Sequence, residues 1–104
     1  MYNISKELFE AVMDNTKFCG ITEYSEIKFT DTSGRKSKNY IHIETFFFKC
    51  KEWGLKQGYV VYSSSKSASI FKDLKQVYMS SNDSSEQQAV FDACMYILEN
   101  KDKQ

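Results

Sequence analysis

The sequence predicts an α+β fold, an antiparallel sheet of four to five strands covered mainly on one face by an N-terminal, a central and a C-terminal helix. Two segments of alternating apolar and polar residues, 25–31 and 39–45, flank a polar turn and indicate a β-hairpin. Three other segments space their apolar residues three and four apart, which is typical of amphipathic helices. A chain of 104 residues has room for one hydrophobic core, so we expect a single domain over residues 1–104.

The N-terminal helix is expected to follow Ser5, whose hydroxyl can accept a hydrogen bond from a free amide of the first turn. Ile4 and Phe9 have the spacing of a hydrophobic staple across that cap. The pattern stops at Asp14, and the apolar face consists of Leu8, Phe9, Val12 and Met13.

β-Branched and aromatic residues predict strands in five segments, which are 18–24, 25–31, 39–45, 59–63 and 74–80. The segment 31–39 is polar and contains Gly34, so we expect a turn that joins the two strands of the hairpin. The segment 63–69 is rich in serine and is predicted to be a surface loop.

The central helix is predicted over residues 46–58, with Thr45 as N-cap and Gly58 at its end. Its main apolar side consists of Phe46, Phe47, Cys50, Trp53 and Gly54. A second stripe of Phe48, Lys51 and Leu55 predicts that this helix contacts neighbours on two sides. The C-terminal helix should follow a cap at Asp83 or Ser84, and its buried face is Val90, Ala93, Cys94, Ile97 and Leu98.

The residue types that enzymes use for chemistry are scarce in this chain. It has one histidine (His42), one arginine (Arg35), no proline and no glycine-rich phosphate loop. The three cysteines form no C-x-x-C pair and lie in apolar surroundings, so we expect all three to be buried as small hydrophobic residues. The sequence therefore predicts a non-enzymatic protein without cofactor or metal. An enzyme with Cys50 or Cys94 as nucleophile is a weaker alternative.

The charges cancel over the whole chain but are unevenly distributed. Residues 28–75 carry ten basic and four acidic side chains, whereas the segments on either side are acidic. The basic segment 28–75 could bind a phosphate backbone, so nucleic-acid binding is one hypothesis. Lysines that are simply solvated, beside acidic helices, explain the same charge pattern more simply. No apolar run approaches the roughly 18 residues of a membrane span, and the N-terminus lacks the core of a signal peptide. We therefore expect a cytoplasmic protein.

The predicted sheet leaves one face open, and several aromatic side chains alternate onto it. Tyrosine is common at the centres of protein interfaces, so this face is the predicted binding surface for a protein partner. Stacking of unpaired bases on the same rings is the nucleic-acid alternative. The predicted binding residues are Tyr24, Tyr40 and His42 with the basic turn Arg35, Lys36 and Lys38, and Tyr59 or Tyr62 can join them.

Three stretches of the chain together show a resemblance. The segments ISKELFEAV (4–12), FKCKEWGLKQGY (48–59) and SSEQQAVFDACMYILENK (84–101) resemble a loose group of small uncharacterised bacteriophage and prophage proteins. The resemblance implies no known activity. It favours a phage-encoded binding protein, for example an inhibitor, that docks on a host protein such as a defence or metabolic enzyme. An exposed sheet edge also leaves association into a homodimer open.

Overall fold

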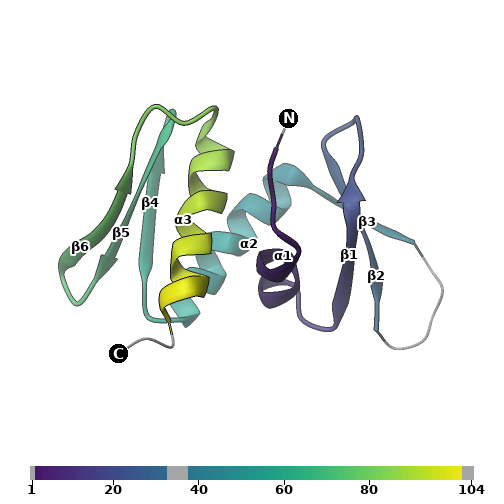
Figure 1. Cartoon of the computed structure of the whole chain (residues 1–104), viewed down its shortest axis with the longest axis horizontal. Coiled ribbons are helices and arrows are strands. Elements are labelled where there is room, and N and C mark those ends of the chain that lie inside the picture. The colour runs from purple at the N-terminus through teal and green to yellow at the C-terminus, as the bar shows by residue number, and fades with distance from the viewer. Residues whose placement is uncertain (1, 33–37, 102–104) are drawn as a thin grey trace.

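The fold was analysed in a computed structural model, which describes residues 2–32 and 38–101. These residues form three helices and two three-stranded antiparallel sheets, which confirms the α+β class. The prediction of a single sheet of four to five strands was wrong. Figure 1 shows the helices between the two sheets, with β1–β3 at one end of the molecule and β4–β6 at the other. The elements in chain order are α1 (Lys6–Val12), β1 (Thr16–Ile21), β2 (Glu26–Asp31), β3 (Asn39–His42), α2 (Ile43–Lys56), β4 (Val60–Ser64), β5 (Ser67–Lys72), β6 (Lys75–Ser80) and α3 (Glu86–Asn100).

The helix α1 forms as the sequence predicts. The Ser5 hydroxyl accepts a hydrogen bond from the amide of Leu8 at 3.0 Å and so caps the first turn. Phe9 is fully buried, and its ring lies 5.1 to 5.5 Å from the rings of Phe18, Phe29 and Phe46. This aromatic cluster joins α1 to the first sheet and to α2.

The first sheet has the strand order β1-β2-β3, with the predicted hairpin formed by β2 and β3. The strand predicted over 18–24 begins two residues earlier and ends three residues earlier, as β1, and its register with β2 shifts between Phe18 and Gly20. Ile27 and Phe29 point inward to the helices, as their alternation predicts, because Ile27 is fully buried and Phe29 packs on Phe9.

The helix α2 begins earlier than predicted, because the N-cap is His42 rather than Thr45. The Nδ1 atom of His42 accepts a hydrogen bond from the amide of Glu44 at 3.2 Å. The strand predicted over 39–45 therefore ends at residue 42. The main apolar side of α2 is buried as predicted, but Phe48 and Leu55 are exposed, so the prediction of contacts on two sides was wrong.

The second sheet contains a strand that the sequence analysis missed. The strand β5 covers part of the predicted serine-rich loop and lies at the centre of the order β4-β5-β6. Ala68 and Ile70 are its inward residues and are buried. Serine at the outward positions, such as Ser67 and Ser69, made the segment look like a loop. Because β5 pairs with both β4 and β6, these three strands form a separate sheet, which is covered by α3.

The helix α3 covers the inner face of the second sheet and begins after Ser85, so its cap lies one residue beyond Ser84 and two beyond Asp83, the two predicted caps. Gln88 is buried and bonds in both directions to the backbone of Asn3, accepting from its amide at 2.7 Å and donating to its carbonyl at 2.9 Å. The extended N-terminal segment is thereby held against α3. The buried apolar residues of all three helices and both sheets form one core.

Candidate protein-binding surfaces

The outer face of the first sheet carries part of the predicted binding surface. Tyr40 is 51% exposed on β3 and pairs with Lys28, while His42 pairs with Glu26. Tyr24 is 75% exposed in the turn between β1 and β2. His42 has a local structural role as the cap of α2. This face therefore mixes aromatic and charged groups, which is typical of a solvated sheet face.

Of the other predicted binding residues, the structure describes Lys38, Tyr59 and Tyr62. Lys38 is exposed just before β3, whereas Arg35 and Lys36 lie outside the residues that the structure describes. Tyr59 is only 4% exposed, so the prediction that its side chain projects into solvent was wrong. The ammonium group of Lys72 lies 4.8 Å from the centre of the Tyr59 ring. Tyr62 is exposed, but it belongs to the second sheet.

The outer face of the second sheet, termed here the β4–β6 outer face, was not predicted as a unit. Alternation and strand register place eight residues of the three strands on it, and none of them is charged. Tyr62 is 59% and Met79 64% exposed, and the rings of Tyr62 and Phe71 pack edge to face at 5.5 Å. Figure 1 shows no described helix or strand on that side. The residues are Val60, Tyr62, Ser64, Ser67, Ser69, Phe71, Gln76 and Met79.

One end of the β4–β6 outer face continues into a hollow of about 440 Å³, lined mainly by apolar side chains and bounded by the turn between β5 and β6. That turn consists of Asp73 and Leu74, and both have positive φ angles, of 52° and 66°. A left-handed conformation costs roughly 1–2 kcal/mol for a residue with a Cβ atom, and two-residue hairpin turns of this type prefer Asn-Gly or Asp-Gly. Leu74 is nevertheless 99% exposed, so it makes no packing contact that compensates for this strain.

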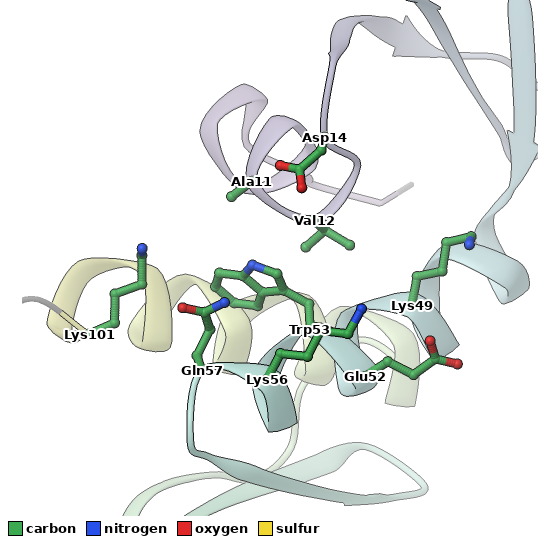
Figure 2. Close-up of a pocket in the computed structure, with 9 residues that line it drawn as sticks. All are labelled: Ala11, Val12, Asp14, Lys49, Glu52, Trp53, Lys56, Gln57 and Lys101. Atoms are coloured by element: carbon green, nitrogen blue, oxygen red, sulfur yellow. The ribbon is translucent and has the colours of Figure 1, made fainter.

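A second hollow, of about 410 Å³, lies where the three helices end. Figure 2 shows the indole of Trp53 between α1 and the ends of α2 and α3, with lysine and carboxylate side chains around it. The carboxylates are Asp14 and Glu52, and the carbonyl ends of the three helices add partial negative charge to this region. These groups oppose the three ammonium groups of Lys49, Lys56 and Lys101, so the hollow favours no single sign of ligand charge.

The cysteines differ in exposure. Cys50 and Cys94 are fully buried, and the Sγ atom of Cys94 donates to the carbonyl of Cys50 at 3.6 Å. Burial, together with the neighbouring Cys94 thiol, raises the pKa of Cys50 well above its usual range, which disfavours the thiolate that a nucleophile needs. Cys19 is exposed in the irregular part of β1, so its expected burial was wrong. Among the described residues, no three His, Cys, Asp or Glu side chains form a group that could hold a metal ion.

Comparisons with known proteins identified no relatives: no family model, no curated protein and no solved structure matches this chain. In the residues covered by the structure, none of the helices has the length and apolar character needed to cross a membrane.

Proposed function

We propose that this protein is a small non-enzymatic binding protein that docks on another protein through the β4–β6 outer face. The observation that carries the proposal is the lack of charge on this face in a chain of which 27% of residues are charged. The centres of protein interfaces are depleted in charged residues and enriched in Tyr, Phe and Met, and those three types are present here.

The outer face of the first sheet provides the contrast. It carries exposed Lys17 and half-buried Glu26 and Lys28 beside Tyr40, so charged groups are distributed over that face and are missing from the β4–β6 outer face. Burial of such charges without paired groups opposes association. Tyr24, Tyr40 and His42 remain a second, predicted contact region, which the experiment below tests separately.

The biological setting is also proposed. The resemblance to small phage proteins favours a phage-encoded protein that acts in the host cytoplasm by binding a host enzyme. Two buried cysteines, one with a raised thiol pKa, support a role in binding rather than in nucleophilic catalysis.

The test is capture of partners from a lysate of the native host with wild-type and variant protein. Tyr62→Ser and Met79→Ser each remove an apolar group from the β4–β6 outer face without disturbing the inner face. Loss of a central interface residue typically costs about 2 kcal/mol, or roughly thirtyfold in Kd. Tyr40→Ser is the matched control on the other sheet. If Tyr62→Ser and Met79→Ser bind like the wild type, the proposed surface is wrong, and a loss confined to Tyr40→Ser would favour the first sheet.

Nucleic-acid binding is the second candidate, and it is favoured by Lys28, which pairs with Tyr40 across β2 and β3, together with Lys17 on β1 and the exposed Lys38 just before β3. Titration with single- and double-stranded DNA at two salt concentrations tests it, because contacts to phosphates weaken steeply as salt rises. Absence of binding at low salt would exclude this function.

A further inference from the structure

We propose that the hollow where the three helices end binds a small zwitterion, and that a free amino acid is the class of ligand it fits. The hollow has a volume of about 410 Å³, within the roughly 300–1,000 Å³ that is typical of small-molecule sites. Its lining residues lie on the helices or just beyond their ends, and none belongs to the β4–β6 outer face. The site is therefore independent of the proposed docking function and goes beyond it.

The indole N–H of Trp53 supplies a hydrogen-bond donor to this hollow. Trp53 is only 8% exposed, and Figure 2 shows the nitrogen of its ring on the side that faces α1 and the hollow. Among the residues that the structure describes, no atom accepts a hydrogen bond from this N–H. No fully buried side-chain nitrogen of those residues lacks a partner, so the indole nitrogen must border the open space of the hollow. Because a tryptophan N–H this deeply placed usually has an acceptor, it is in position to bind one on a ligand.

The charged side chains around the indole are of both signs and are not paired with each other. Three ammonium groups and two carboxylates line the hollow, and none of them forms an ion pair in the described part of the chain. Glu52 and Lys56 remain unpaired although they have the i, i+4 spacing at which ion pairs form on a helix. Unpaired charges of both signs around one hollow fit a ligand that carries both a negative and a positive group. The five residues are Asp14, Lys49, Glu52, Lys56 and Lys101.

The donors and acceptors around the hollow assign the two ends of the ligand. The Trp53 N–H and the Lys56 ammonium can only donate, so they suit a carboxylate, and Lys56 lies about one helical turn beyond Trp53 on the same face of α2. The ionised Asp14 carboxylate can only accept and lies on the α1 side in Figure 2, so it suits an ammonium group. The carbonyl ends of the helices favour the same positive group.

The acceptors in the hollow need N–H donors, which a primary ammonium group has and a quaternary one lacks. Quaternary ammonium ligands are held instead by open aromatic faces, and Trp53 is too buried to offer one. A free amino acid combines a carboxylate with a primary ammonium group in a small molecule, and it therefore matches both the size of the hollow and its donors and acceptors.

The first experiment uses Trp53 as the probe. It is the one tryptophan in the chain, so its fluorescence and its single indole N–H resonance both report on this hollow. The wild-type protein is titrated with each of the standard amino acids other than tryptophan and tyrosine. We expect at least one of them to change both signals saturably, with the resonance moving downfield as the N–H gains a carboxylate acceptor. The N-acetyl derivative and the methyl ester of that amino acid each lack one charge, so they should bind at least about tenfold more weakly.

Two substitutions test the assignment of the ends. Asp14→Asn should weaken binding of the amino acid about three- to fivefold and leave binding of its N-acetyl derivative unchanged, because that derivative has no ammonium group. Lys56→Gln should weaken binding of the amino acid by a similar factor and leave binding of the methyl ester unchanged. Asp73→Asn and Lys66→Gln, in hairpin turns away from the hollow, are the matched controls and should bind like the wild type. All four side chains are exposed, so the fold should be retained.

The other outcomes would each overturn the proposal. No saturable change with any amino acid would show that the hollow holds only solvent. An N-acetyl derivative that binds as tightly as the amino acid would indicate an anion site, and a methyl ester that does so would indicate a cation site. Glycine betaine that binds equally well would exclude the need for a primary ammonium group, and equal losses in Asp14→Asn and Asp73→Asn would place the ligand elsewhere. None of these results bears on docking at the β4–β6 outer face, which Tyr62→Ser tests separately.

Discussion

Replacing Gly54 with alanine adds a methyl group at the point where α2 meets both β4 and α3. A Cβ atom at this position would lie 3.0 Å from Cγ2 of Val61 and 3.2 Å from Cδ1 of Ile97. Both neighbours are buried, and Ile97 has no exposed surface, so neither side chain can move away into solvent. Gly54 is therefore expected to be needed for the close approach of the helix to its neighbours.

Two effects of opposite sign determine the result. Alanine is favoured over glycine within a helix by about 1 kcal/mol. An extra methyl group in a packed core costs typically 1–3 kcal/mol. We expect the second effect to dominate, so that Gly54→Ala lowers the free energy of unfolding by about 1 kcal/mol, which corresponds to a fall of about 4–8 °C in Tm.

Urea denaturation measures the free energy of unfolding, and a double-mutant cycle with Val61→Ala identifies the cause. Val61→Ala removes the Cγ2 atom, so the added methyl group should be tolerated better in the double variant than in Gly54→Ala alone. A favourable coupling of about 0.5 kcal/mol or more is expected. A Gly54→Ala protein more stable than the wild type, or two strictly additive substitutions, would refute the reasoning.

Three further predictions concern the core, the thiols and the dependence on pH. Phe9→Ala removes the ring at the centre of the aromatic cluster and should cost about 3–5 kcal/mol, measured by urea denaturation. Native protein should label rapidly with a thiol reagent at Cys19 and slowly at Cys50 and Cys94, and fast reaction at either buried site would contradict the structure. Burial, then the neighbouring Asp83 carboxylate, raises the pKa of Asp92 to about 6, so the folded state holds a proton between pH 4 and 6 that the unfolded state has lost. This contribution to stability is therefore present at about pH 4 and lost as the pH rises through 6, and Asp92→Asn should remove that part of the pH dependence.

Structural features that depend only on residues close together in the sequence were predicted best. The cap at Ser5 and the alternation in β2 depend on neighbours within a few positions, and both were predicted correctly. The start of α2 was missed because histidine is an uncommon cap, and the residues after His42 are also compatible with a continued strand.

The division into two sheets could not be predicted from the sequence, because it depends on one strand. When β5 is read as a loop, residues 59–80 contain only two strands. Because two strands alone do not form a stable sheet, the sequence then predicts that both belong to one sheet with the strands of residues 18–45. The β4–β6 outer face was missed for the same reason, because Ser69 and Phe71 of β5 lie between its residues on β4 and its residues on β6. The alternation of Ala68 and Ile70 was the available signal. The strain at Leu74 has no signature in the sequence, because it depends on the φ angle of the turn.

The position of α3 in the chain has a consequence for synthesis. Ala89, Ala93 and Ile97 of α3 are fully buried, and this helix follows all six strands in the sequence. Until the ribosome has released residues 86–100, the sheet β4–β6 therefore lacks its helix cover, and the N-terminal segment lacks the helix that holds it. A nascent chain stalled before that point should keep the inner side of its second sheet accessible to chaperones, and completion of the fold should coincide with the emergence of this last helix.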